Sequence, residues 1–124
     1  MRLTLRYLSD FFRRDPFSRN CFIFGAVLWL TMSGLLMSTL GVFQEKGELL
    51  TLHYNVFFGI DDVGSWSNLI LIPITGALIL IINLGFAAKI NDRFPEIARV
   101  LVLGATSANA LLLIATAVIR VANI

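Results

Sequence analysis

The sequence predicts an all-α membrane protein with three transmembrane helices, an amphipathic helix before the first, and an extended loop between the first two. Two observations predict this fold class. The chain is 57% hydrophobic and only 15% charged, with a mean hydropathy of +0.82, whereas soluble domains are about 25% charged. Three long stretches also lack charge altogether. The 124 residues have room for three spans of about 20 residues, but not for a large enzyme core or several domains.

The three uncharged stretches are residues 20–44, 63–88 and 100–119. As a helix the first would reach about 37 Å, more than the roughly 30 Å of hydrocarbon, so tilt or fraying is expected. The third, at about 30 Å, matches a bilayer. We therefore expect a cytoplasmic arm at 1–15 and a transmembrane domain at 16–124, with spans at about 20–43, 66–88 and 96–120, an outer loop at 44–65 and an inner loop at 89–95.

Residues that favour helix starts precede each span. Asp15 and Pro16 are suited to open the first helix. Ser65 or Ser67 could cap the second, which would place Pro73 about two turns in, where a mild kink is expected. For the third helix the expected cap is Asn91 or Asp92, and the expected first-turn residue is Pro95.

The basic residues are divided unevenly between the two sides of the predicted membrane. Eight precede the first span or join the second to the third, and two lie on the other side. The positive-inside rule therefore predicts a multi-pass protein of the plasma (inner) membrane, with a cytoplasmic N-terminus and an outer C-terminus. The first group is Arg2, Arg6, Arg13, Arg14, Arg19, Lys89, Arg93 and Arg99, and the second is Lys46 and Arg120.

A cleavable signal peptide is the alternative for the first span, because residues 39–41, Thr-Leu-Gly, resemble a weak cleavage site. The apolar run is longer than the usual 7–15-residue core of a signal peptide, so an uncleaved signal anchor is favoured. Cleavage would leave a two-helix hairpin. The single cysteine, Cys21, excludes an intramolecular disulfide and is interpreted as a small residue near a helix start, with acylation as the alternative.

The N-terminal arm has the pattern of an amphipathic helix. At 100° per residue its apolar side chains fall in one sector, with Arg and Asp opposite, which is typical of a helix lying on the inner leaflet. Its basic face could sense lipid or dock a partner, or the arm could only anchor the topology. The apolar sector holds Leu5, Tyr7, Leu8, Phe11 and Phe12, and the candidate contacts to lipid headgroups are Arg2, Arg6, Arg13 and Arg14.

The outer loop alternates apolar and other residues from Leu50 to Ile60, a period of two that predicts an extended segment. Because hydrocarbon does not satisfy unpaired backbone groups, we expect this segment at the outer interface or paired with a strand of another chain. Pairing would make it an assembly site, with residues 59–64 as a turn into the second span. The candidate interaction residues are His53, Tyr54, Asn55, Gly59, Asp61 and Asp62.

One histidine and two carboxylates in this loop raise the alternative of a metal or proton site. Their spacing matches no metal signature, so local hydrogen bonding of His53 and turn chemistry of Asp61 and Asp62 are favoured. No Gly-rich phosphate loop, nucleophile elbow or H-E-x-x-H motif is present. The sequence therefore predicts no catalytic residue, no metal, no cofactor and no enzyme.

Residues 52–64, L-H-Y-N-V-F-F-G-I-D-D-V-G, resemble a signature of small bacterial multi-pass membrane proteins of unknown role, of the form L-H-Y-N-x-x-F-G-I-D-x-x-G. Asp62 departs from the apolar residue expected at its position. The similarity continues through Trp66, Pro73, Gly76 and Asn83, about the middle third of the chain. The resemblance implies a membrane protein and supplies no activity or cofactor.

Polar and small residues within the spans predict how the helices pack. We expect Asn83 to contact Thr106, and Asn109 to find a partner on the first or second span, Ser33 and Thr75 being candidates. A polar pathway for an ion is the alternative. Close approach is expected at two small-xxx-small pairs and a flat patch, and Trp29 is expected to fill packing space. The small residues are Gly34 with Ser38, Gly104 with Ala108, and Gly76 with Ala77.

These features predict a small non-enzymatic subunit or scaffold that associates with itself or with a larger membrane complex in the lipid bilayer. An oligomeric channel or carrier lined by Asn83 and Asn109 is the first alternative, and a membrane enzyme or metal site at the outer loop is the second. The net charge of +2 is too small to indicate a nucleic-acid partner.

Overall fold

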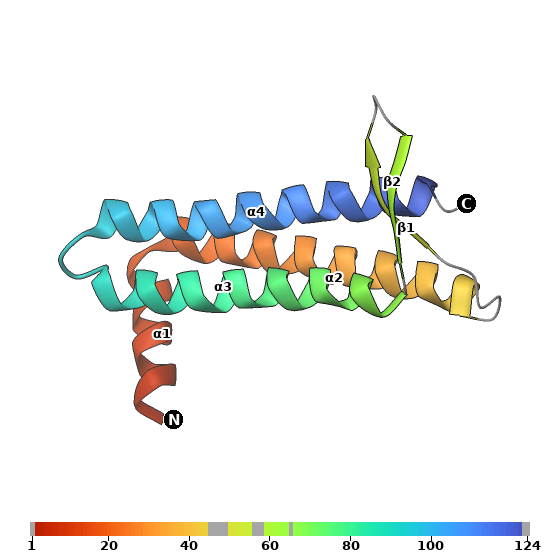
Figure 1. Ribbon diagram of the computed structural model, residues 1–124. Coiled ribbons are helices and arrows are strands. Elements are labelled where there is room, and N and C mark those ends of the chain that lie inside the picture. The colour runs from red at the N-terminus through yellow and green to blue at the C-terminus, as the bar shows by residue number, and fades with distance from the viewer. Residues whose placement is uncertain (1, 45–49, 56–58, 65, 123–124) are drawn as a thin grey trace.

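Three long helices lie side by side and form the body of the protein (Figure 1). The computed structural model describes residues 2–44, 50–55, 59–64 and 66–122. A short helix, α1, runs across the bundle axis at one end, and a β-hairpin stands beside α4 near the other end, where the C-terminus also lies. The elements are α1 Arg2–Arg14, α2 Pro16–Gln44, β1 Leu50–Asn55, β2 Gly59–Gly64, η1 Trp66–Ile70, α3 Leu71–Ile90 and α4 Pro95–Ala122.

Three segments are helical, long and apolar enough to cross a membrane: Pro16–Gly41, Asn68–Ile90 and Pro95–Ala122. Large apolar side chains cover their outer surface, and Ile81 and Leu111 are 66% and 68% exposed. Soluble monomers rarely expose apolar patches of this extent, whereas lipid solvates them. The prediction of three membrane-length helices is confirmed.

The start of α2 is confirmed. The second span becomes helical at Trp66, within a residue of the predicted start, but as the 3-10 helix η1 that runs into α3. Asp15 caps α2, because its carboxylate accepts a 3.4 Å hydrogen bond from the Ser18 N–H, and Pro16 is the first helical residue. The α-helix α3 begins only at Leu71, and its N-cap, Ile70, makes no side-chain cap. Pro73 therefore lies in the first turn, where an N–H has no helical partner in any case, so no kink is needed.

The turn between α3 and α4 also differs from the prediction at one point. Pro95 opens α4 as expected, but neither Asn91 nor Asp92 caps it, because the residue before the helix is Phe94, whose carbonyl accepts from Ala98. Asn91 instead ends α3, donating its backbone N–H to the carbonyl of Ala87. The turn between α3 and α4 is therefore shorter than the predicted inner loop at 89–95.

The outer segment is a hairpin. Leu50–Asn55 is extended, as predicted, but Gly59–Gly64 is a second, antiparallel strand and not a turn. Its pairing satisfies one edge of the β1 backbone from within the same chain. A three-residue connection costs little closure entropy, whereas another chain would also lose translational freedom on pairing. The register is irregular around His53.

The apolar core lies in two clusters, one at each end of the bundle. Phe11 of α1 is buried at one end against α3 and α4, and Leu36, Leu40 and Leu69 form the core near the hairpin. The helices approach closely at two glycines. A Cβ at Gly25 would lie 3.0 Å from the Thr106 hydroxyl, and one at Gly76 would lie 2.7 Å from Asn109 Oδ1.

The predicted small-xxx-small pairs do not make these close approaches. A Cβ added at Gly34 or Gly104 would meet nothing within 4 Å, and both glycines are exposed. The prediction for these pairs is wrong, and the one for Gly76 is right. Spacing along one helix does not reveal which of its faces meets a neighbour, so the pattern alone could not separate the two cases.

Candidate functional site

The predicted outer-loop residues lie on the two strands of the hairpin. β1 carries His53, Tyr54 and Asn55, and β2 carries Gly59, Asp61 and Asp62. The register pairs His53 with Asp62 and Asn55 with Gly59, so the hairpin brings the two groups of candidates together. The side chains of residues 42–67 lie outside the described part of the structure.

Asn109 joins α4 to α3 at mid-bundle. Its side chain is fully buried, and its Nδ2 donates to the carbonyls of Gly76, at 3.3 Å, and Ala105, at 3.0 Å. The predicted partner on the second span is therefore a backbone carbonyl rather than the hydroxyl of Thr75 or Ser33. Oδ1 has no hydrogen-bond partner among the described residues and faces the Cα of Gly76, which only a glycine allows.

The predicted contact between Asn83 and Thr106 does not form. Asn83 donates to the carbonyl of Ile79 in its own helix, at 2.8 Å. The Thr106 hydroxyl donates at 2.9 Å to the carbonyl of Cys21, and lies 3.0 Å from that of Val102. Thr106 thus joins α4 to α2, whereas the Asn83 side chain joins no second helix within the described residues. Equal depth in the membrane was not enough to pair them, because the two side chains leave their helices in different directions.

The sequence did not predict a third link between helices at mid-bundle. The indole Nε1 of Trp29 donates to the carbonyl of Pro73 at 2.8 Å, joining α2 to α3. The sequence indicated only that Trp29 fills packing space. A signal was present, since a buried Trp N–H needs an acceptor. With the Asn109 and Thr106 bonds, each pair of long helices carries one side-chain bond to a backbone carbonyl.

A buried carboxylate lies at the α1 end of the bundle. The side chain of Asp15 is 5% exposed, and Oδ2 accepts from the Ser18 hydroxyl at 2.9 Å and from Arg99 Nε at 3.0 Å. Burial by itself would raise the pKa of the Asp15 carboxyl, but the hydrogen bonds from Ser18 and Arg99 outweigh it and hold that pKa below its ordinary value. This cluster fastens the start of α2 to α4.

The described part of α1 has one side against the bundle and one side exposed. Phe11 is buried and packs with Leu8 and Phe12 at the cluster of α3 and α4, while Arg13 and Arg14 are exposed. Arg14 contacts Asp92 at 3.1 Å across to the turn between α3 and α4. The side chains of the other two candidate headgroup contacts, Arg2 and Arg6, lie outside the described part.

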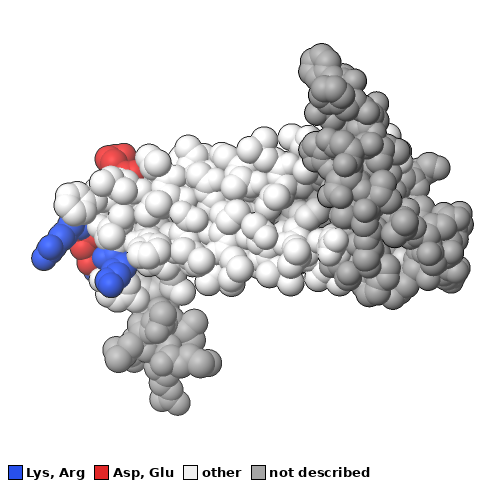
Figure 2. Space-filling view, viewed as in Figure 1, with Lys and Arg blue, Asp and Glu red and all other residues white. Residues whose placement is uncertain are grey.

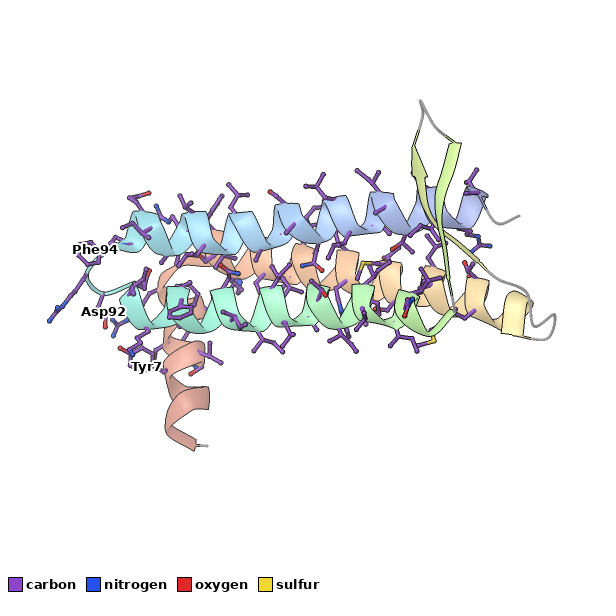
Figure 3. All side chains as sticks on the ribbon, viewed as in Figure 1. Tyr7, Asp92 and Phe94 are labelled. Carbon is purple, nitrogen blue, oxygen red and sulfur yellow. The ribbon has the colours of Figure 1, made fainter. Side chains whose placement is uncertain are left out.

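Among the side chains that the structure describes, most charged ones lie at this end of the bundle. On the face shown in Figure 2, the coloured Lys, Arg, Asp and Glu atoms gather at the turn between α3 and α4, and uncharged atoms cover the helices beyond it. Tyr7 and Asp92 lie close together there (Figure 3) and line a small cleft of about 60 Å³. No three His, Cys, Asp or Glu side chains gather as a metal site within the described residues.

The fold, with its three apolar helices and a charged end, fits a multi-pass membrane protein. No protein-family model matches this chain, and no curated protein and no solved structure is similar to it. The resemblance of residues 52–64 to small bacterial membrane proteins therefore stays a prediction.

Proposed function

We propose that the protein is a non-enzymatic structural or assembly subunit of a membrane complex, inserted in the plasma membrane with its N-terminus in the cytoplasm. The observation that carries the proposal is the two-stranded hairpin. β1 and β2 pair with each other, and neither has a second neighbour among the described strands. Each strand therefore keeps one edge of backbone donors and acceptors without a strand beside it, and a two-stranded hairpin is only marginally stable by itself.

A strand from another subunit is the natural partner for such an edge. Adding a strand supplies backbone hydrogen bonds along the whole edge and requires no catalytic chemistry. Three polar side chains of the spans support the same role, because Trp29, Thr106 and Asn109 bond to backbone carbonyls inside the bundle. They stabilise a scaffold and are not turned outward.

Orientation in the membrane follows from the charge distribution. The arm and the turn between α3 and α4 lie at the same end of the bundle, so the eight basic residues of the predicted inner side gather there. Arg120, in the last turn of α4, lies at the opposite end. This distribution supports a cytoplasmic N-terminus.

The assembly role is tested by cross-linking in native membranes. In a Cys21→Ser background, Thr51→Cys places a thiol on β1, and Arg93→Cys places a matched thiol in the turn at the opposite end. We expect a thiol cross-linker to convert the Thr51→Cys protein into a larger adduct and to leave the Arg93→Cys protein monomeric. Equal adducts from both variants would assign the contacts to random collision, and monomers alone would contradict an assembly role.

The two alternative functions have separate tests. An oligomeric channel lined by Asn83 and Asn109 predicts ion or solute flux in liposomes, but Asn109 is fully buried inside one chain, which favours packing. A metal or enzyme site at the hairpin gains support from the pairing of His53 with Asp62. It predicts a bound divalent metal that His53→Ala removes, and an unchanged metal content would dispose of it.

A further inference from the structure

A large, mostly apolar groove lies between α1 and α3. This interfacial groove has a volume of about 730 Å³ and is lined by Tyr7 and Leu8 of α1 and by Ile81, Gly85 and Lys89 of α3, with Leu84 and Ala88 between them. It exists because α1 crosses the end of the bundle instead of continuing along it, and because Gly85 has no side chain to fill the angle (Figure 1).

The groove is amphipathic along its length. Its floor is apolar and continues toward the middle of the membrane through Ile81, which is 66% exposed. At the end of the bundle it is lined by Lys89 and Tyr7. A membrane lipid has the same polarity, with acyl chains toward the bilayer centre and a phosphate at the surface.

The charge around the groove favours a negatively charged lipid. Asp15 and Glu96 are paired with Arg99, and Asp92 is paired with Arg14. Lys89 forms no ion pair within the described residues, and neither do its basic neighbours at this end, Arg13 and Arg93. The one remaining acidic residue of this end, Asp10, lines the neighbouring polar cleft, which shares Tyr7 and Ala88 with the groove. One carboxylate thus stands against the three unpaired basic side chains. A positive charge is therefore left at the mouth of the groove.

We propose that the interfacial groove binds one anionic glycerophospholipid of the leaflet in which α1 lies. An acyl chain packs along Ile81 and Gly85, and the phosphate contacts the Lys89 ammonium. Basic pockets beside transmembrane helices recognise lipid headgroups in this way. The site requires insertion in a membrane but not the assembly role of the hairpin, so either proposal can fail without the other.

Native mass spectrometry of the delipidated full-length protein tests the site. Phosphatidylglycerol and phosphatidylcholine with identical acyl chains are added separately to the protein in detergent micelles. We expect one phosphatidylglycerol to bind with about fivefold higher affinity than phosphatidylcholine, as one lysine near a headgroup would give. Equal binding of the two lipids would overturn the proposal.

Two pairs of matched variants locate the site. Lys89→Gln should abolish the preference for phosphatidylglycerol, while Arg93→Gln, which removes the same charge from the neighbouring turn, should keep it. Gly85→Leu should fill the groove and weaken the binding of both lipids. Gly104→Leu is the matched control and should leave binding unchanged, because a Cβ meets nothing within 4 Å at either glycine. Equal losses in Lys89→Gln and Arg93→Gln would indicate diffuse attraction and contradict a site, as would unchanged binding in Gly85→Leu.

Discussion

The middle and the α1 end of the bundle are both held by polar contacts, but of different kinds. At mid-bundle the donors are uncharged, and each bonds to a backbone carbonyl of another helix: Trp29 to Pro73, Thr106 to Cys21 and Asn109 to Gly76. At the α1 end the contacts centre on a charged group, the Asp15 carboxylate, which accepts hydrogen bonds from Ser18 and Arg99. Hydrocarbon makes a charge far more costly than an amide or hydroxyl, so charged side chains are kept to the two ends of the bundle, where water and headgroups reach them.

Packing and pH act at different places in this protein. The mid-bundle contacts depend on close approach of backbones, which a single methyl group can prevent. The contacts at the end depend on ionisation, which acid can remove. Substitutions at the two places should therefore fail in different ways.

The largest loss is expected where the backbones are closest. Gly76→Ala would place its Cβ 2.7 Å from Asn109 Oδ1 and 3.1 Å from Met32 Cε, so the amide must shift. We expect the free energy of unfolding in mixed micelles to fall by about 1–3 kcal/mol. Gly104→Ala is the control, because its Cβ meets open space. Equal stability of the two variants would contradict a close approach at Gly76.

A smaller loss is expected when the amide itself is removed. Asn109→Leu keeps about the same volume but loses the bond to the Gly76 carbonyl, and bonds between membrane helices are worth about 0.6–2 kcal/mol. Asn83→Leu is the matched control, since its amide bonds only within its own helix. In the same unfolding titration, Asn109→Leu should lower the free energy of unfolding by about 1 kcal/mol, and Asn83→Leu should lower it less. The reverse order would exclude Asn109 as the link between α3 and α4.

The Asp15 cluster should respond to pH, unlike the mid-bundle contacts. Because folding lowers the pKa of Asp15, its contribution is complete above the ordinary pKa of a carboxyl, near 3.9, and is lost as pH falls through the folded value. Asp15→Ala should cost about 1 kcal/mol at pH 7 through the lost cap. The difference in melting temperature between wild type and variant should shrink below about pH 4, and a constant difference would contradict a stabilising ionised Asp15.

The smallest effect is expected at the exposed ion pair between Arg14 and Asp92, whose side chains are 67% and 59% exposed. Such pairs contribute about 0–1 kcal/mol because water screens them. Arg14→Gln should leave the melting temperature within about 1–2 °C of the wild type. A loss as large as that of Asp15→Ala would mean that α1 is fastened by this pair and not by Phe11.

Much of the helical framework could be predicted because apolar length and charge position act locally. Residues 16–41 and 95–122 are helical where the uncharged runs and Pro95 indicated. The start of α3 could not be predicted, since Ser65 and Ser67 are good caps in isolation but a 3-10 turn intervenes before Leu71. The hairpin was half predicted: the period of two identified β1, but β2 holds two glycines and two aspartates, residues that strands disfavour.

The partners of polar side chains were the least predictable part of the candidate site. Asn109 was correctly placed at an interface, but its acceptor is a carbonyl, a group that every residue carries and that no pattern marks. Trp29 and Arg99 find their acceptors 44 and 84 residues away in the chain. Depth along a helix can be counted from the sequence, whereas direction around it depends on which face the neighbours cover.

Three membrane-length helices and the clustering of basic residues in the arm and at 89–99 follow from the sequence alone, because hydrophobicity and charge act on each segment separately. Three other features emerge only when the elements pack together. These are the neighbour that each glycine meets, the return of residues 59–64 as a strand, and the turn of α1 across the bundle that leaves a groove beside Lys89. These features arise from the relative rotation and approach of packed elements, and that geometry is a property of the whole bundle rather than of any one segment.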